Sequence, residues 1–332
     1  MNVSIIILVY NHERYIQECL ESIKHQVIKY NKDRQHWLQV IIGDDASADK
    51  TEEKVNQWLA VNKNCFSDFI YLRNEQNAGT CKNYLNALER ASGDYIKAIG
   101  GDDFFPERSI FELMSYLDKY DIVYGNPLVY VEGKNNSYKK VKKEVLKIHC
   151  NYMEESRLSY YDRIHRYCFF NAPGTYVKKE LLTNREVRDF LSEYKYIDDY
   201  TQWIKYSELR DIHIKYIPGI TVIYRRTSGS AYFVRNKEVR REIIQIYQYA
   251  LQTSREWFGK LLVRNAIYMQ KKENPVKYLD IMAYLHKFYQ IKHRNGKGLE
   301  IGQEIAENLA YIKKLKRNAA RLQKKRKQQI AE

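Results

Sequence analysis

The chain has 332 residues, of which 44% are hydrophobic and 14% aromatic, a composition that excludes a disordered chain and allows one large domain with or without an appendage. Its net charge of +15 is concentrated at the C-terminal end, because residues from Asn236 onward carry 22 Lys and Arg against 9 Asp and Glu. A basic tail on a nearly neutral body predicts an anionic partner surface, either acidic lipid or nucleic acid.

The first part of the chain alternates short apolar runs with helical patterns. Val3–Tyr10 is apolar and rich in β-branched residues, which is typical of a strand buried on both faces. Three more strands are predicted after intervening helical stretches, at Leu38–Gly43, Phe69–Arg73 and Tyr95–Ile99. This order predicts an α/β fold of Rossmann-like type, with an open, mostly parallel sheet flanked by helices.

The middle of the chain is mixed and its end is helical. Strands are predicted at Ile122–Val131 and Tyr138–Ile148, and two short strands are predicted on either side of Pro218 and Gly219. The predicted helices are Glu155–Tyr167, Lys179–Phe190 and Asp198–Leu209. From Asn236 the pattern is helical, so we predict a domain over residues 1–235 and a helical, basic C-terminal region over 236–332.

Cysteine usage and hydropathy bear on the compartment. The five cysteines include no Cys-x-x-Cys pair, which argues against a disulfide framework or a zinc site and fits a reducing cytoplasm. The N-terminal apolar run is too short for a signal peptide, and no stretch approaches the ~20 apolar residues of a membrane span. We therefore expect a cytoplasmic protein that lies on a membrane if it meets one.

Polar residues follow each of the four early strands. They are Tyr10-Asn11, Asp44-Asp45, Arg73-Asn74 and Gly100-Gly101-Asp102-Asp103. Because the carboxyl ends of such strands share one rim of the sheet, the two acidic pairs should face one crevice and repel each other. A shared divalent cation, Mg²⁺ or Mn²⁺, removes this repulsion, and we predict that Asp102 and Asp103 bind it.

Two neighbouring features favour a phosphate ligand, and one alternative competes. Gly100 and Gly101 allow close approach of a ligand, and Lys82 lies at a predicted helix N-terminus, where phosphates bind. The alternative is that these acidic residues cap helices or close turns. Capping is favoured for Asp49, the alternatives are balanced for Asp44-Asp45, and ligand binding is favoured for Asp102-Asp103.

Taken together, these stretches resemble the GT-A-fold glycosyltransferases of family 2, the large inverting family that builds bacterial polysaccharides. The resemblance covers about residues 3–230, and four motifs occur in the family's order. The matching segments are V-S-I-I-I-L-V-Y-N-H-E-R-Y-I, I-I-G-D-D-A-S-A-D-K-T, N-E-Q-N-A-G-T-C-K-N-Y-L-N-A-L-E-R-A-S-G-D-Y-I and I-G-G-D-D-F-F-P.

The resemblance implies a donor site for a nucleotide-diphosphate sugar. Tyr10 and Asn11 match the family's Tyr-Asn turn, and Tyr10 with Asp44 or Asp45 would hold the nucleobase, for which uracil is expected. The other implied contacts are Glu13 at the ribose, and Lys82 and Asn83 near the diphosphate and the sugar.

The metal motif departs from the family pattern. Asp102 matches the last acid of the family's Asp-x-Asp motif, but the first acid is replaced by Gly100. Metal coordination would therefore rest on Asp102, with Asp103 in support, or on the diphosphate itself.

Two segments in the second half resemble the acceptor side of the family. Ile197–Ile204 matches its Glu-Asp pair, so Asp199 would be the catalytic base that takes the proton from the acceptor hydroxyl, with Asp198 beside it. The alternative is an acidic pair that only opens a helix. Tyr224–Ser230 matches a Tyr-Arg-x-His-x-x-Ser segment with Thr227 in place of His, and Arg225 and Arg226 would close over the diphosphate.

The basic tail has three competing interpretations. Apolar residues recur at helical spacing from Ile301 to Leu322 among many Lys and Arg, which indicates a basic amphipathic helix. Such a helix can lie on anionic lipid, pair with a second copy in a homo-oligomer, or pack on its own domain. We place the membrane first because polysaccharide acceptors of the resembling family are lipid-linked at the inner face of the membrane.

The predicted activity is transfer of a sugar from a nucleotide-diphosphate donor to a hydroxyl of a glycan or lipid-linked glycan acceptor, a hexosyltransferase reaction of surface polysaccharide synthesis such as capsule or O-antigen. One alternative is a non-catalytic nucleotide-sugar-binding protein with a degenerate metal site, which Gly100 and Thr227 favour. A nucleic-acid-binding protein is less favoured. A sugar nucleotidyltransferase is disfavoured because Tyr10–Glu13 is not a glycine-rich basic loop.

Overall fold

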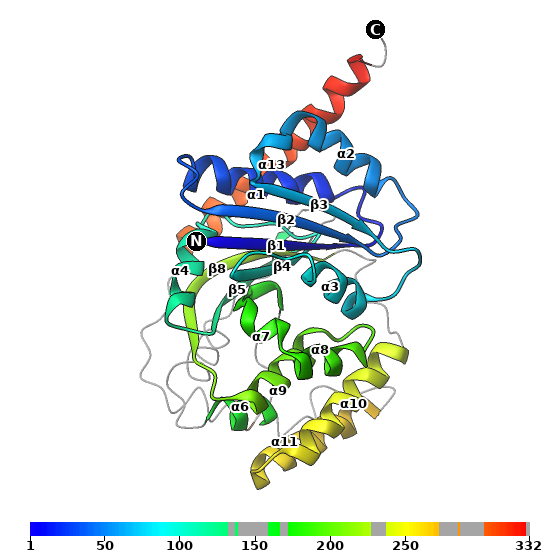
Figure 1. Ribbon diagram of the computed structural model, residues 1–332, viewed down its shortest axis with the longest axis vertical. Coiled ribbons are helices and arrows are strands. Elements are labelled where there is room, and N and C mark those ends of the chain that lie inside the picture. The colour runs from blue at the N-terminus through cyan, green and yellow to red at the C-terminus, as the bar shows by residue number, and fades with distance from the viewer. Residues whose placement is uncertain are drawn as a thin grey trace.

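The computed structural model describes residues 1–131, 137–138, 159–166, 172–226, 237–271, 285 and 302–329. A sheet forms its centre, with strands in the order β3-β2-β1-β4-β7-β5-β6 and with β8 paired to β5 (Figure 1). The strands are β1 (Asn2–Val9), β2 (Trp37–Asp44), β3 (Asp68–Arg73), β4 (Tyr95–Gly100), β5 (Ile122–Val131), β6 (Ser137–Tyr138), β7 (Thr175–Lys178) and β8 (Ile214–Arg226).

Helices cover both faces of the sheet (Figure 1). The N-terminal helices are α1 (Ile16–Tyr30), α2 (Thr51–Asn62), α3 (Thr80–Leu88) and α4 (Ile110–Ser115). Those that follow are α6 (Tyr160–Arg166), α7 (Lys179–Thr183), α8 (Arg185–Ser192), α9 (Asp199–Leu209), α10 (Lys237–Thr253), α11 (Trp257–Lys271) and α13 (Gly302–Gln329). The predicted α/β fold with a mostly parallel first half and a helical C-terminal region is confirmed.

The alternation of side chains along β1 explains the layers. Ile5 and Ile7 point to the face covered by α1, α2 and α4, whereas Ile6 points to the face covered by α3, α7, α8 and α9. All three side chains are fully buried. A strand that is apolar on both faces suits only the middle of a sheet covered on both sides, and β1 lies between β2 and β4.

Two predicted element boundaries were wrong. The two short strands around Pro218 and Gly219 form a single strand, β8, whose register against β5 shifts at Gly125 and Asn126, so the Pro-Gly pair makes a bulge and not a break. The single helix predicted at Lys179–Phe190 is two helices, because Asn184 is extended and its side-chain oxygen caps α8 by accepting from the Glu186 amide at 2.9 Å. Most of the strand predicted at Tyr138–Ile148 lies outside the described residues.

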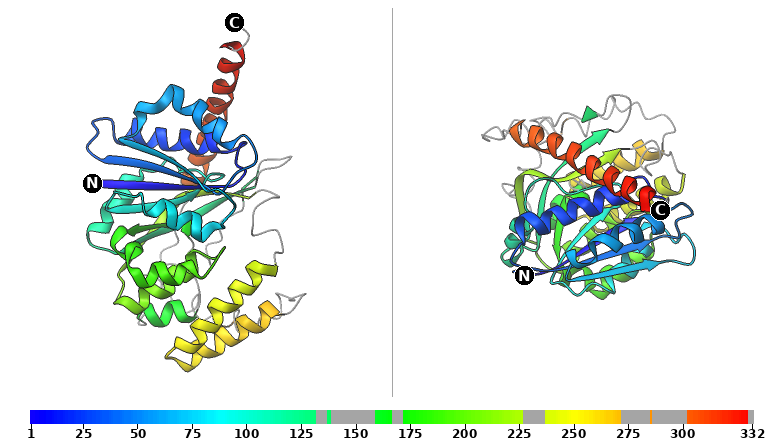
Figure 2. Two further views of the ribbon diagram at one scale, coloured as in Figure 1. Left: turned by 45° about the vertical axis from the view of Figure 1, so that its right-hand side comes forward. Right: turned by 90° about the horizontal axis from the view of Figure 1, so that it is seen from above.

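The C-terminal helices pack on the sheet domain. α10 contacts α6 and α9, α11 contacts α6, and α13 runs over α1 and contacts β8 (Figure 2). Tyr311, Ile312 and Leu315 of α13 are buried against Phe104 and Leu128. Over this stretch the apolar face of α13 is used by the protein itself, which is the third of the interpretations given above for the tail. Across the part of the chain that the structure describes, no helix is both long and apolar enough to span a bilayer.

Candidate active site

The carboxyl ends of β1, β2 and β4 lie level at one edge of the sheet. The parallel register pairs Val9 with Asp44 and Leu8 with Gly100. Backbone bonds continue this alignment into the loops, since the Asp45 amide donates to the Val9 carbonyl at 3.0 Å and the Gly101 amide donates to the Leu8 carbonyl at 2.8 Å. The loops that the sequence singled out therefore start side by side.

The loops after β1 and β2 are tied together by side chains. The Asn11 amide donates to Ser47 Oγ at 2.9 Å, and Asn11 Oδ1 accepts from the Ala48 amide at 2.8 Å. The Glu13 amide donates to Asp49 Oδ2 at 3.0 Å. Asn11 and Glu13 thus shape this corner of the rim, while Tyr10 keeps 47% of its surface exposed beside it.

Asp49 also behaves as a capping residue. Its Oδ1 accepts from the Thr51 amide at 2.9 Å, at the first residue of α2. This agrees with the capping interpretation that the sequence favoured.

Asp44 is fully buried at the end of β2, where its carboxylate joins three groups. It accepts from the Tyr71 hydroxyl, from Arg73 Nη1 at 3.1 Å and from the Ser47 amide at 2.8 Å. The carboxylate raises the pKa of Tyr71, although burial of the phenol is the larger cause. Asp44 therefore fixes the base of the β2 loop.

Asp45 anchors the loop that precedes α3. Its carboxylate accepts from Asn74 Nδ2 at 2.9 Å and from the amides of Ala78 and Gly79 at 2.7 and 2.8 Å. Gly79 has a φ of 90° and packs against Lys195, so a side chain at this position is excluded by both conformation and space.

The two predicted donor-side residues of α3 face different ways. Asn83 is buried, and its amide donates to the Gly43 carbonyl at 2.8 Å, which ties α3 to β2. Lys82 is exposed at the start of the helix. Of the two, only Lys82 has its side chain available to a ligand in solution.

The Gly100–Asp103 loop brings two carboxylates together. A Cβ atom on Gly100 would lie 2.7 Å from Asp102 Oδ1 and 3.4 Å from Asp103 Oδ2, so both carboxylates lie over the glycine. The space of the family's missing acid is therefore filled by the two acids that follow. Asp102 is partly exposed and Asp103 is buried. Burial, followed by the charge of Asp102, raises the pKa of Asp103 well above its ordinary value.

Arg225 is hydrogen-bonded to the Gly100–Asp103 loop. Its amide donates to Asp103 Oδ1 and its Nε to the Asp102 carbonyl, each at 2.7 Å, and Nη2 pairs with Glu18 of α1. The guanidinium lies 4.6 Å from the ring centroid of Tyr15 and is 0% exposed. This differs from the expectation that Arg225 closes over a diphosphate, because its charge is buried and its bonds go to the loop and to Glu18.

Arg226 is placed differently from its neighbour. It is partly exposed, and its guanidinium lies 6.0 Å from the ring centroid of Tyr224. Thr227 and the rest of the segment to Ser230 lie outside the described residues.

The predicted base pair lies at the start of α9. Asp199 Oδ1 accepts from the Tyr200 amide at 2.7 Å, and the carboxylate also accepts from the Ala172 amide. Burial raises the pKa of Asp199, and these backbone bonds oppose the rise. Burial and then the charge of Asp199 raise the pKa of Asp198 to about 7. Asp198 makes no side-chain capping bond to the helix, and bonds from the backbone amides of Asp198 and Asp199 oppose the rise in its pKa.

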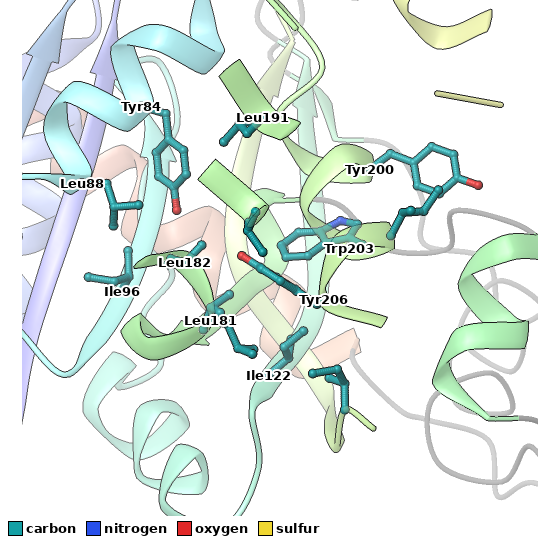
Figure 3. Packing of buried hydrophobic residues seen from close by; sticks show 14 of the residues in the cluster. Tyr84, Leu88, Ile96, Ile122, Leu181, Leu182, Leu191, Tyr200, Trp203 and Tyr206 are labelled. Carbon is teal, nitrogen blue, oxygen red and sulfur yellow. The ribbon is translucent and has the colours of Figure 1, made fainter. Parts of the chain in front are cut away.

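A small cavity lies beside Asp198, between the sheet and α9. Its polar lining residues are Thr175, Asp198 and Gln202, whereas its larger apolar and aromatic lining residues include Tyr84, Leu182 and Trp203. Figure 3 shows Tyr84 of α3, Leu182 of α7 and Trp203 of α9 converging on this region. A carboxylate with such neighbours is held in low-polarity surroundings, which is the physical cause of its raised pKa.

Three residues that sequence reasoning missed position the site. Glu18 pairs with Arg225, and Lys97 of β4 donates to the carbonyls of Pro173 and Thr175. Glu242 of α10 accepts from the amides of Lys195, Tyr196 and Ile197 at 2.8 to 3.1 Å, just before the acidic pair. A single lysine within an apolar strand, Lys97, was the only one of the three with a visible signal.

Solved structures of low identity show the fold. TarS residues 1–349 of S. aureus in complex with UDP-GlcNAc gives a TM-score of 0.56 at 19% identity, over 81% of this chain and 72% of that one. The mannosyltransferase PcManGT of Pyrobaculum calidifontis in complex with GDP-Man and Mn²⁺ gives 0.57 at 16% identity, over 96% and 83%. The sheet, its covering helices and the rim of polar loops thus define a protein of the GT-A fold class.

The family follows from sequence. The model of "Glycosyl transferase family 2" matches residues 4–176, more than half of the chain, and the chain therefore belongs to that family. Abequosyltransferase RfbV of Salmonella typhimurium is 32% identical over 48% of this chain and 47% of its own length. Glycosyltransferase GlyG of Streptococcus pneumoniae is 24% identical over 89% and 98%. The chain spans about half of the length of RfbV, and less of several other curated relatives.

Proposed function

We propose that this protein is an inverting glycosyltransferase that moves a hexosyl group from a nucleotide-diphosphate sugar, with UDP as the nucleotide, to a hydroxyl of a glycan or lipid-linked glycan. The observation that carries the proposal is the arrangement of two acidic centres around β4. The loop that contains Asp102 and Asp103 directly follows β4, and the turn at residues 172–174, whose Ala172 amide bonds Asp199, packs against β4.

The donor-side residues divide into ligand contacts and supports. Tyr10 has an exposed ring at the rim and offers a face on which a uracil can stack. Asp44, Asp45 and Asn83 are buried with hydrogen bonds to neighbouring loops, so they hold the walls of the nucleotide site. Glu13 lies three residues after Tyr10 on the same loop, where its Oε2 accepts from the Lys50 amide at 3.0 Å, and we assign its carboxylate to the ribose.

The leaving diphosphate requires positive charge. Lys82 at the start of α3 and the partly exposed Arg226 are the cations of the predicted set that a diphosphate can reach. Within the described residues, no group of three or more His, Cys, Asp or Glu is placed to hold a metal ion. A single accessible carboxylate, Asp102, suits Mg²⁺ or Mn²⁺ that is bound mainly through substrate phosphates, and such an ion would neutralise the diphosphate when bound.

Asp199 is the proposed base. Inversion requires a carboxylate that takes the proton of the acceptor hydroxyl as this attacks the anomeric carbon. Two amide bonds keep the Asp199 carboxylate oriented and favour its ionised form, whereas Asp198 beside it has a pKa of about 7. We assign proton transfer to Asp199, and to Asp198 the tuning of its partner's pKa.

The acceptor class is inferred from relatives. RfbV is an abequosyltransferase, and GgaB of Bacillus subtilis, 26% identical over 54% of this chain, is a minor teichoic acid biosynthesis protein. These names support a surface polysaccharide as the product, O-antigen and capsule included. We also propose an anionic membrane as the surface that the projecting C-terminal end of α13 meets at the inner face of the cell membrane (Figure 1).

The test is a donor screen. The purified protein is incubated with UDP- and GDP-sugars, with and without Mn²⁺ and with water as the acceptor, and release of UDP or GDP and of the free sugar is measured. We expect release with at least one UDP-sugar and loss of release in Asp199→Asn. Retained UDP binding without turnover of any donor would instead establish a non-catalytic binding protein. NMR of the product then gives the anomeric configuration, and retention would overturn the inverting mechanism.

A further inference from the structure

Lys97 is a buried lysine in the middle of the sheet. It lies on β4, three residues before Gly100, and is 0% exposed. Its Nζ donates to the carbonyls of Pro173 and Thr175, the latter at 3.3 Å, and lies 4.6 Å from the ring centroid of Tyr176. A buried ammonium is costly unless it is bonded, so its contacts indicate a specific role.

The partner of Lys97 is a tight turn, residues 172–175, which we call the base turn. Ala172 at its start donates its amide to the carboxylate of Asp199. Gly174 packs so closely that a Cβ atom there would lie 2.5 Å from the Gly125 carbonyl oxygen. The base turn is therefore bonded to Lys97 on one side and to Asp199 on the other.

The charges around Lys97 link it to the other acidic centre. Burial lowers the pKa of Lys97 to about 7, and the negative charge of Asp103 opposes this shift. Either protonation state of an amine keeps at least two N–H groups, so the two carbonyl bonds survive through neutral pH.

We propose that Lys97 is a positioning residue for Asp199, which acts by fixing the base turn so that the Ala172 amide stays on the carboxylate. Because Lys97 stands on the strand that ends in the Asp102-Asp103 loop, the same strand sets the position of both acidic centres. The inference rests on the proposed function in one respect, the assignment of Asp199 as base.

A predicted shift in pH dependence follows. Loss of the hydrogen bond from the Ala172 amide removes an interaction that favours the ionised form of Asp199, so the pKa of Asp199 rises. The acidic limb of the pH–rate profile, over which the base becomes ionised, therefore moves to higher pH. Among the described residues, the titratable groups Asp198 at the same helix start and Cys81 of α3 interact electrostatically with Asp199, and Glu242 of α10 acts on the same cysteine. All three are unchanged by a substitution at position 97.

The experiment compares two variants of the full chain with one control. Lys97→Met removes every donor, whereas Lys97→Gln keeps two N–H donors without the charge. Val40→Ala, in the buried part of β2, destabilises the domain without touching the base turn. We expect Lys97→Met to lower kcat roughly 10-fold and to move the acidic limb of the pH profile to higher pH, Lys97→Gln to stay close to wild type, and Val40→Ala to leave the limb in place.

Hydrogen exchange gives a readout that needs no activity. The amides of residues 172–175 should exchange faster in Lys97→Met than in Lys97→Gln, relative to the amides of β2 in each protein. If the wild-type enzyme is active and Lys97→Met shows the same pH profile and the same amide exchange as wild type, the inference about Lys97 is overturned and the proposed function is not. Absence of turnover in wild type would overturn the proposed function, while the exchange result still decides the role of Lys97 in the turn. If Lys97→Met does not fold, Lys97→Gln decides. Wild-type protection of residues 172–175 together with an unshifted pH profile, as expected for retained donors, supports the inference, whereas lost protection with an unshifted pH profile overturns it.

Discussion

Asp198 has a pKa that burial, and then the charge of Asp199, raise to about 7. If Asp199 is the base, Asp198→Asn removes the neighbouring charge, and the pKa of Asp199 falls. We expect the acidic limb of kcat/KM to move to lower pH in this variant. Asp199→Asn should instead lower kcat by about 10²- to 10⁴-fold at every pH. If Asp198→Asn abolishes turnover and Asp199→Asn does not, the two roles are reversed.

The same pKa predicts how stability depends on pH. An acid whose folded pKa is raised stabilises the folded state below its unfolded pKa, near 4, and loses this contribution as pH rises through about 7. Asp198→Asn removes the cost of holding an ionised carboxylate at this position in the folded protein. The free energy of unfolding of the variant should therefore exceed that of wild type by more at pH 8 than at pH 5. Urea denaturation at the two pH values measures the difference, and equal gains at both would contradict the burial of this charge.

Two glycines with similar crowding should respond differently to alanine. At Gly100 the atom that a Cβ would meet first is the end of the Asp102 side chain, at 2.7 Å, whereas at Gly174 it is the Gly125 backbone oxygen, at 2.5 Å. A side chain can rotate away and a backbone cannot. Gly100→Ala should therefore raise the Mn²⁺ concentration needed for half-maximal activity, about 10-fold, with little loss of stability. Gly174→Ala should lower the free energy of unfolding by roughly 1–3 kcal/mol. The opposite pattern would show that Asp102 takes no part in metal binding.

The residues at the carboxyl ends of β1, β2 and β4 could be predicted from the sequence, because they directly follow strands and the strand ends are marked by local hydrophobic patterns. Their partners were not readable. Glu18 and Arg225 are 207 positions apart, and Glu242 lies 47 positions from the amide of Lys195 that it accepts from. Nothing local in either partner's sequence marks such pairs, because they form only when the helices pack on the sheet.

At the scale of elements, α10 supports the start of α9. Glu242 accepts three consecutive amides just ahead of Asp198, and charge-assisted bonds of this kind are among the stronger ones. We expect Glu242→Ala to lower kcat about 10- to 100-fold through misplacement of the acidic pair, with KM for the donor nearly unchanged. Glu238→Gln is the matched control, since Glu238 lies on the same helix and accepts from the side-chain hydroxyl of Tyr196 at 3.0 Å, whereas Glu242 accepts from the backbone. Equal effects of the two changes would argue against a positioning role.

The division of the chain at residue 235 was a reasonable reading of composition, and it remains a prediction. The charge changes there, but the packing continues across this point, because α10 contacts α6 and α9, and α13 lies on α1. Composition indicates which segments are exposed to solvent on average. It does not determine against which strand or helix the apolar face of a given helix packs. The single strand β8 illustrates the same limit, since Pro218 and Gly219 are tolerated where the partner strand β5 shifts register.

At the scale of the whole molecule, α13 has two parts with different predicted roles. Glu304 accepts from the Ile220 amide at 2.8 Å, Asn308 accepts from the Glu107 amide at 2.9 Å, and Tyr311, Ile312 and Leu315 are buried. A chain that ends at residue 301 would expose this cluster, and we expect it to lose on the order of 5 kcal/mol of unfolding free energy. A chain that ends at residue 321 keeps all of these contacts and should be as stable as wild type.

The same pair of truncations tests the membrane proposal. Because the apolar face is packed on the domain as far as Leu315, the attraction to lipid must come from charge, and the cut at 321 removes Lys324, Lys325, Arg326 and Lys327. Binding to vesicles with anionic lipid should therefore be several-fold weaker for the chain that ends at residue 321 than for wild type. Binding of the wild-type protein should also weaken as the salt concentration rises, since exposed charges are screened within ~10 Å at 0.1 M salt. Sedimentation with vesicles measures both effects. Undiminished vesicle binding after the cut at 321 would exclude the tail as the contact, and RNA binding lost by that cut would favour nucleic acid as its partner.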